Sequence, residues 1–409
     1  MSEYIGKYEG NYVGKDKYIS NDEVCKILSE VVSVDSTFGR EGNCGRLIEK
    51  ICKDNGLTVE IMPVTDERFN VMITVGADSY KSEKLGLMLH GHYDTVPVLD
   101  MEEPFVTKIR DNKMWGRGIV DQKSGLVASI CAAIAIKRSG RQLKKPLCIA
   151  AVVDEESEHR GSYTLVRSGV DAEYAIVTEP TNTETCEFGC KGTSPVCITV
   201  KGRTAHASNP WCGVNAIQKA MPILDRLFKV NFPEVDIGEL GKLRGTLCVS
   251  KLDAGTAYNN VPGEAVIWMD RRTVPGENTA LALAQVNAII EEAKKQDSEL
   301  EATAEVARPD WHWQPIRERG LNPTRMDTDC ELYHILQRAA TKSGMAPLQK
   351  RYSNGYNEMD FLINDLGIQT LVYGPGDGQM AHSPREEVDI DKVCNVTEVF
   401  CNMIEEICM

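Results

Sequence analysis

The chain has 409 residues, of which 42% are hydrophobic, and a formal net charge of −14. One hydrophobic core rarely supports this length, so the sequence predicts two domains. The acidic balance argues against a nucleic-acid-binding protein, which needs basic patches. The first residues lack the apolar middle of a signal peptide, and no apolar run approaches a membrane span, which favours a cytoplasmic protein without membrane attachment.

The N-terminal part alternates helical and strand patterns. Ser20 and Glu23 have capping-box spacing before one helix, and Gly56 ends a second helical stripe. Further along, strands are expected at 57–64, 70–75, 85–89, 147–153 and 175–177, with a buried helix over 126–134. Strands that alternate with helices predict an α/β sheet that is at least partly parallel.

The pattern changes near Lys191 and changes back beyond Asp327. Between them, strands are expected at 194–201, 247–252, 265–270 and 302–306, and helices over 213–227 and 278–295. These elements read as a self-contained α+β unit. The sequence therefore predicts that residues 191–310 are inserted between two parts of a larger domain, 1–190 and 311–409.

Fourteen cysteines are scattered along the chain, without a Cys-x-x-Cys pair. This distribution argues against a thiolate zinc site, and in a long chain without a signal peptide it predicts reduced, mostly buried thiols.

Metal-ligand side chains recur directly after the predicted strands and in one Gly-rich turn. They are His92 with Asp94, Asp121, Glu155 with Glu156, Glu179 and His382. In open α/β sheets, ligands bind at the carboxyl ends of strands, so these five segments can converge there. Imidazole and carboxylate donors without thiolates suit Zn²⁺ and also tolerate Co²⁺ or Mn²⁺.

A bridging Asp121 would let these side chains hold two ions per subunit. One ion would take His92, Asp121 and Glu179, and the other would take Asp121, Glu156 and His382. Ions roughly 3.5–4 Å apart activate a shared water and polarise a carbonyl. Glu155 then has no ligand task and is the natural general base, while Asp94 can orient the His92 imidazole.

The runs GHYDTVP, GRGIVDQKSG, DEES, EPT and AHSPREE carry a family resemblance. From about Asn21 to its end, the chain resembles the metallopeptidases that include acetylornithine deacetylases, succinyl-diaminopimelate desuccinylases, aminoacylases, dipeptidases and glutamate carboxypeptidases. The resemblance implies a zinc-exopeptidase-like catalytic domain with a mixed, largely parallel sheet. It also implies an inserted α+β, ferredoxin-like lid that mediates homodimerisation. The family's catalytic Asp falls on Asp94 and its general base on Glu155.

The inserted unit carries matching signals. The segment GRTAHASNPWCGVNAI is similar to the family's lid segment, and the resemblance implies that His206 reaches the partner subunit's active site and stabilises the oxyanion. Asn259 and Arg272 resemble the substrate-holding Asn and Arg of the family, and their neighbours Asn260 and Arg271 are the alternative matches.

The segment RYSNGYNEMDF departs from the Thr-Asp-Ala pattern of many relatives. Glu358 is similar to a Glu of the acetylornithine deacetylases, and its carboxylate predicts pairing with a cationic substrate amine. Gly376 is also expected to contact the substrate. His90 is expected to pack at a strand end, and His159 to lie at the surface or to form local bonds.

Together these features predict a metal-dependent deacylase that hydrolyses the amide bond of a small N-acyl amino acid. The alternative with the same machinery is a dipeptidase or carboxypeptidase, and hydrolysis of a carbamoyl amide is a third reading. A non-catalytic metal- or ligand-binding relative is disfavoured, because such a protein has no use for Glu155.

Overall fold

The computed structural model describes residues 18–409. Residues 1–17, on which the expectation about a signal peptide rests, lie outside the described part of the chain. The described residues form two compact units. Unit 1 holds the chain up to Gly189 together with Met326–Tyr352 and Asn357–Met409, and unit 2 holds Cys190–Arg325 and Ser353–Tyr356.

Unit 2 extends further than the expected range of 191–310, so residues 311–325 were wrongly given to the larger domain. The reason is local pairing. Thr193 bridges to Leu321, and the Thr324 N–H donates to the Cys190 carbonyl (3.1 Å). These contacts hold the returning segment against the first residues of the unit.

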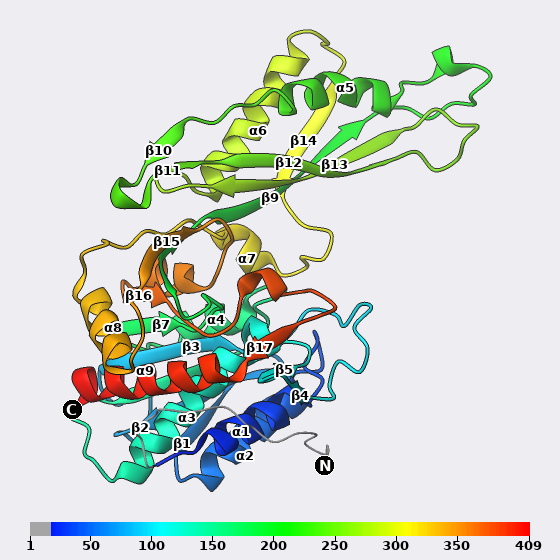
Figure 1. Cartoon of the computed structure of the whole chain (residues 1–409). Helices are drawn as coiled ribbons and strands as arrows, with labels where there is room; N and C mark the ends of the chain where they lie inside the picture. Colours follow the sequence, from blue (N-terminus) through cyan, green and yellow to red (C-terminus); the bar gives the residue numbers. More distant parts are fainter. Residues whose placement is uncertain (1–17) are drawn as a thin grey trace. The chain divides into compact units, whose positions relative to one another are not determined.

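An eight-stranded mixed sheet forms the centre of unit 1 (Figure 1). Its order is β1(Thr58–Pro63), β2(Phe69–Val75), β6(Leu147–Val152), β3(Leu85–His92), β7(Ala172–Val177), β16(Gln369–Val372), β8(Thr185–Cys190) and β15(Gln349–Ser353). The neighbours β6, β3, β7 and β16 run parallel, whereas β1, β2 and β8 pair antiparallel to their neighbours. This arrangement confirms the predicted mixed, largely parallel sheet.

Every residue of β3 and β6 is buried. Strands covered on both faces are expected to be continuously apolar, and both are nearly so in the sequence. The helices of unit 1 are α1(Asn21–Val32), α2(Gly42–Asp54), α3(Ser124–Ser139), α4(Arg160–Val166), α8(Glu331–Lys342) and α9(Ile390–Cys408). Among them α3 and α9 pack on each other and on β3. A small sheet of β4(Lys108–Arg110), β5(Lys113–Trp115) and β17(Glu387–Asp389) completes the unit.

The segment Ile119–Ser139, which contains α3, is long and apolar enough to cross a membrane by length and composition alone. The expectation that no apolar run approaches a membrane span is therefore wrong for this segment. However, 94% of its most apolar window is buried inside the structure. Such burial is typical of the core helix of a globular unit.

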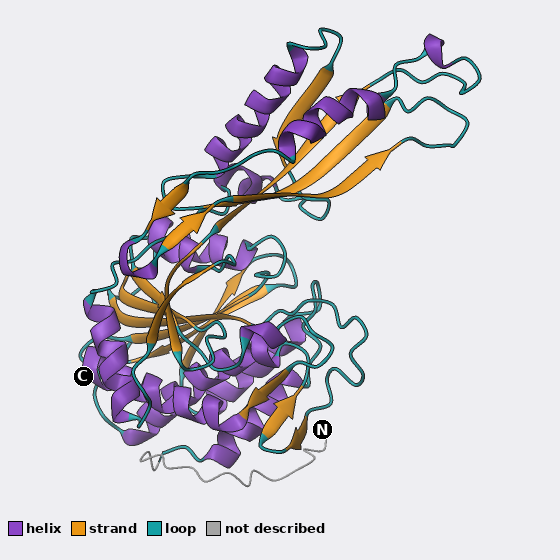
Figure 2. Cartoon of the chain, turned by 45° about the horizontal axis from the view of Figure 1, so that its top comes forward, coloured by secondary structure: helices purple, strands orange, loops and turns teal. Residues whose placement is uncertain are grey.

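Unit 2 is built on a four-stranded antiparallel sheet, β12(Thr246–Ala254), β13(Glu264–Thr273), β9(Gly192–Lys201) and β14(Glu301–Val306). Helices α5(Ala216–Leu227) and α6(Thr279–Lys294) pack on it (Figure 2). The core between them includes Val196, Ile198 and Val200, which alternate along β9 as one face of a strand requires. The unit also holds the hairpin of β10(Glu234–Asp236) and β11(Lys242–Arg244), and the short helix α7(Gln314–Arg319).

Candidate metal centre

His92 is the last residue of β3, in the middle of the parallel strands, and its side chain is fully buried. Its Nδ1 lies 3.0 Å from the Asp94 carbonyl and 3.4 Å from the Asp94 carboxylate. Acceptors on this side place the ring proton on Nδ1, so Nε2 keeps its lone pair. The predicted orienting role of Asp94 fits this geometry.

Asp121 lies between two imidazoles. Its Oδ1 is 3.1 Å from His92 Nε2, and its Oδ2 is 3.2 Å from His382 Nε2. Each carboxylate oxygen therefore faces a different histidine. This is the arrangement that a carboxylate shared by two ions would need.

Three further carboxylates surround this axis. Glu179 approaches His92 Nε2 to 3.8 Å, and Glu155 approaches the same atom to 3.9 Å. Glu156 lies 3.0 Å from His382 Nε2. The turn that carries Glu155 and Glu156 is held by Asp94, whose two carboxylate oxygens accept their backbone N–H groups (3.2 and 3.0 Å).

These residues form three groups of three, and within each group the ligand atoms all lie within 4.8 Å of one another. Two groups are the predicted ones, His92–Asp121–Glu179 and Asp121–Glu156–His382, and the third is His92–Glu155–Glu156. All the donors are imidazole nitrogens or carboxylate oxygens, which suit Zn²⁺ and related divalent ions. The five segments singled out in the sequence thus meet at one place in unit 1.

Most of the chain, including this cluster of histidines and carboxylates, matches one known protein family. Residues 88–406 match the model of peptidase family M20/M25/M40, and this span contains His92, His382 and every carboxylate between them. The chain belongs to this peptidase family. It is therefore a hydrolase of amide bonds, which confirms the predicted reaction class.

Relatives in sequence agree with the assignment, and a solved structure shares the fold. The chain is 24% identical over 394 residues to a "[LysW]-lysine/[LysW]-ornithine hydrolase" of Sulfurisphaera tokodaii, covering 96% of this chain and 98% of the relative. It is 27% identical to an acetylornithine deacetylase of Myxococcus xanthus, covering 84% and 85%. Its fold is similar to that of the aminopeptidase PepT of Bacillus cereus, with a TM-score of 0.75, 21% identity, and coverage of 95% of this chain and 99% of that one.

Electrostatics in the centre favour bound cations, as in a metal-dependent member of the family. Burial raises the pKa values of Glu155 and Glu179 well above their ordinary range, and neighbouring carboxylates raise them further. Hydrogen bonds to Asp121 and Glu156 raise the pKa of His382 to about 10. Without ions, the cluster must therefore hold extra protons, and divalent cations would replace those protons.

Two residues that the sequence interpretation missed support the ligands. Glu386 is buried and accepts the backbone N–H groups of Gly118, Val120 and Asp121 at 2.9–3.2 Å. Gln122 donates its side-chain amide to Glu179. Glu386 stands in the AHSPREE run, but a carboxylate that binds backbone amides leaves no spacing pattern in a sequence.

Glu358 is buried, with its Oε1 3.2 Å from His159 Nδ1 and its Oε2 3.7 Å from His90 Nε2. The expectation for His159 was wrong, because this side chain is buried and reaches a residue 199 positions away. Gly376 has φ 87°, and its backbone lies beside Val120 and Pro180, the neighbours of Asp121 and Glu179. The substrate contacts of Glu358 and Gly376 stay predictions.

In unit 2, His206 and Asn259 lie on paired loops. His206 bridges to Asn260, and the Ala207 N–H donates to the Asn259 carbonyl (2.8 Å). His206 is exposed, and its Nδ1 accepts the Ser208 N–H (3.1 Å). A neutral ring in this state carries its proton on Nε2 and offers it as a donor.

The two candidate arginines differ in what they bind. Arg271 is buried, and its guanidinium donates to Glu277 and Gln285. The Arg272 side chain is 32% exposed and pairs with Asp270. Arg271 therefore has a structural task, and Arg272 is the better candidate for a substrate carboxylate.

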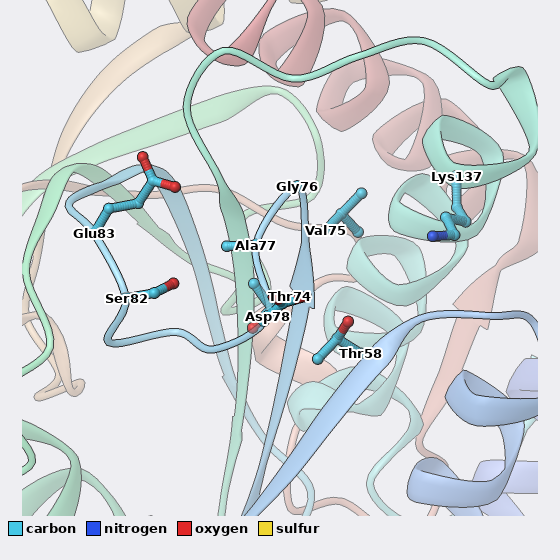
Figure 3. A pocket seen from close by; sticks show the side chains of 9 residues that line it. All are labelled: Thr58, Thr74, Val75, Gly76, Ala77, Asp78, Ser82, Glu83 and Lys137. Atoms are coloured by element: carbon cyan, nitrogen blue, oxygen red, sulfur yellow. The ribbon is translucent and has the colours of Figure 1, made fainter.

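A hollow of about 460 Å³ lies elsewhere in unit 1, and none of the predicted site residues lines it (Figure 3). Its lining includes Thr74 and Val75 of β2 and Lys137 of α3. Val75 pairs with Leu147 at the start of β6, whereas His92 pairs with Val152 at its end. The hollow therefore lies near the amino end of β6, and the metal-ligand residue His92 lies near its carboxyl end.

Proposed function

We propose that the protein is a deacylase that hydrolyses the amide bond of a small N-acyl amino acid with the help of two divalent ions. The observation that carries this proposal is Asp121, whose two oxygens face His92 and His382, with Glu155 beside the same centre. His92, Asp121 and Glu179 would hold one ion, and Asp121, Glu156 and His382 the other. Bound there, the ions would lower the pKa of water and polarise the scissile carbonyl.

Glu155 acts as the general base. It takes a proton from the attacking water as the new C–O bond forms, and it passes that proton to the leaving nitrogen as the C–N bond breaks. The products are a carboxylic acid and a free amino acid. Asp94 assists by fixing the His92 ring and the backbone of the turn that presents Glu155.

His206 supplies a hydrogen bond to the oxyanion in this proposal, contributed to the active site of a partner subunit. The Nε2–H donor left by the Ser208 contact supports this role. Arg272 and Asn259 bind the substrate carboxylate, for which a guanidinium has matching geometry. Homodimerisation through unit 2 is supported by β12, an edge strand whose backbone a second copy can pair with. Light scattering tests the dimer.

Glu358 and Gly376 complete the substrate site, and Glu358 pairs with a cationic amine of the substrate. The names of two relatives support this choice, because both mention ornithine or lysine derivatives. Within the described residues, Glu358 Oε2 has no hydrogen-bond partner. If Glu358→Gln left the preference between cationic and neutral substrates unchanged, this pairing would be excluded.

A hydrolysis screen tests the function. N-acetyl, N-succinyl and unblocked dipeptide substrates are compared on protein reconstituted with Zn²⁺ or Co²⁺, with chelator-treated protein as the control. We expect release of amino acid from blocked substrates, with Zn²⁺ as the native ion and Co²⁺ or Mn²⁺ as substitutes. Cleavage of unblocked dipeptides alone would replace the deacylase by a dipeptidase. A cytoplasmic location belongs to the same proposal, and cell fractionation tests it.

A further inference from the structure

The turn that presents Glu155 and Glu156 begins at Asp154, which has a left-handed backbone with φ 71°. The Asp154 carbonyl accepts the His159 N–H (2.7 Å), and its side chain accepts the Arg160 N–H (3.2 Å) at the start of α4. Asp tolerates this backbone region better than most residues, and the two hydrogen bonds fix Asp154 in it. Asp154 is therefore the point from which the directions of Glu155 and Glu156 are set.

Arg68, directly before β2, reaches Asp154 from 86 residues away in the sequence. Its Nη2 lies 2.5 Å from Asp154 Oδ1 and 2.6 Å from Glu41 Oε1, and its Nε lies 3.0 Å from the same Glu41 oxygen. The side chain of Arg68 is 8% exposed, and those of Glu41 and Asp154 are fully buried. The Phe38 ring, which is exposed, lies over the guanidinium at 4.5 Å.

Without Arg68, two buried carboxylates would lose the cation that they share. Arg160 Nε lies 3.7 Å from Asp154 Oδ2, so the lost charge would be compensated only in part, and Asp154 would move toward Arg160 or toward water. Such a movement starts one residue from Glu155 and two from Glu156. Asp94 holds these two residues only by their backbone N–H groups.

We propose that Arg68 is a positioning residue. By binding both Asp154 and Glu41, it clamps Asp154 in place and so fixes the orientation of the Glu155 and Glu156 side chains toward the metal centre. Among the described residues, the hydrogen bonds of the Arg68 guanidinium go to Glu41 and Asp154 and not to the metal-ligand residues or Glu155, so its effect passes through Asp154. The inference rests on the proposed function for the role of Glu155.

Arg68→Met tests the clamp, with Arg46→Met as the matched control. Arg46 also lies over an aromatic ring, Phe69, and pairs with a carboxylate, Glu49, but its side chain is 60% exposed. For Arg68→Met at saturating Zn²⁺ we expect kcat to fall about 10- to 100-fold with KM within about threefold, the scale of losses when a supporting contact is removed. Arg46→Met should keep both constants.

Chemical rescue separates positioning from general stability. In Arg68→Ala, guanidinium chloride at non-denaturing concentrations should restore part of the lost kcat, whereas sodium chloride at equal ionic strength should not. Asp154→Asn keeps a residue that tolerates a left-handed backbone. As a single substitution it should lower kcat, and combined with Arg68→Met it should add little to the loss of kcat that Arg68→Met causes. All assays are run well below the melting temperature of each variant.

Zn²⁺ affinity gives a readout that needs no activity. In Arg68→Met we expect weaker binding of the Zn²⁺ that Asp121, Glu156 and His382 would hold, because Glu156 would be displaced. In Arg46→Met the binding of both ions should be unchanged. If wild type hydrolyses no amide, the proposed function fails while this arm still tests the clamp. Full kcat and unchanged Zn²⁺ binding in Arg68→Met would overturn the inference. So would a loss that guanidinium does not restore and that simply adds to Asp154→Asn.

Discussion

At the scale of single residues, the carboxylates of the metal centre differ in which histidines they contact. Both oxygens of Asp121 face imidazoles, and Glu156 and Glu179 lie toward one histidine each. Glu155 also approaches His92, but Asp121, Glu156 and Glu179 suffice as carboxylate ligands for two ions. A carboxylate beside the ions without a necessary ligand task is free to carry protons.

Glu155→Gln therefore separates chemistry from metal binding. The amide keeps the shape of the side chain but cannot accept a proton from water. We expect kcat to fall about 100- to 10,000-fold, the usual contribution of a general base, while two ions still bind. Steady-state kinetics and elemental analysis of the same sample measure both quantities. Full turnover with both ions bound would remove Glu155 from the mechanism.

The stability of the metal-free protein should depend on pH in a definite direction. The pKa of His382 is raised from 6.5 to about 10 in the folded state, and those of Glu155 and Glu179 are raised above 4.5. A raised pKa means that the folded state binds the proton more tightly. Its stabilising contribution is complete below the unfolded pKa and is lost as pH rises through the folded one.

We therefore expect the melting temperature of metal-free protein to fall between pH 6.5 and 10. The Zn²⁺-loaded protein should change less, because the ions take the place of the protons. Thermal unfolding at several pH values, with and without chelator, measures the difference. His382→Asn should flatten the metal-free curve, and a melting temperature that rose with pH would contradict the assignment.

At the scale of elements, α3 and β7 meet without room for a side chain. A Cβ on Gly125, in the first turn of α3, would lie 2.1 Å from the carbonyl oxygen of Thr178. Thr178 follows β7 and precedes Glu179. The glycine thus lets the helix that follows Asp121 lie directly against the strand end that carries Glu179.

Gly125→Ala should push these two elements apart. We expect a loss of about 1–3 kcal/mol in the free energy of unfolding, as for other overpacked sites, together with weaker metal binding through Glu179. Chemical denaturation and metal titration measure the two effects. Gly355→Ala is the control, because its Cβ would come no closer than 3.7 Å to another atom. Equal effects of the two substitutions would contradict the close-contact argument.

The same elements show what the sequence can reveal. Apolar runs that end in His or a carboxylate predicted β3, β6 and β7 and the convergence of their ligands, because burial and chemistry both leave a local pattern. Arg68 and Glu386 lacked such a signal. They bind residues 86 and 269 positions away, and their neighbours in the sequence have no part in those contacts.

At the scale of the whole molecule, all five metal-ligand candidates and Glu155 belong to unit 1. The sequence predicted the change of pattern at Lys191 but placed the return too early, because the pairing of Leu321 with Thr193 is not local. Most cysteines are buried, as predicted from their scattered distribution, and none of those in the described residues forms a disulfide.

Removing the metal should therefore destabilise unit 1 alone. An ion present at 100 times its Kd stabilises its unit by about 2.7 kcal/mol, and a chelator should abolish this gain. Differential scanning calorimetry measures the transitions. Asn215→Ala marks the transition of unit 2, because Asn215 caps α5 and its loss costs about 1 kcal/mol. A chelator that lowered only the marked transition would contradict the assignment.

The route by which the chain leaves and re-enters unit 1 has an engineering consequence. The Met326 N–H donates to the Phe188 carbonyl at 2.7 Å, so exit and return lie side by side within unit 1. A gap this narrow can be closed by a turn of a few residues. The antiparallel module between them is thus exchangeable in principle: a shorter or foreign domain can be grafted at these two points without cutting any strand that bears a ligand.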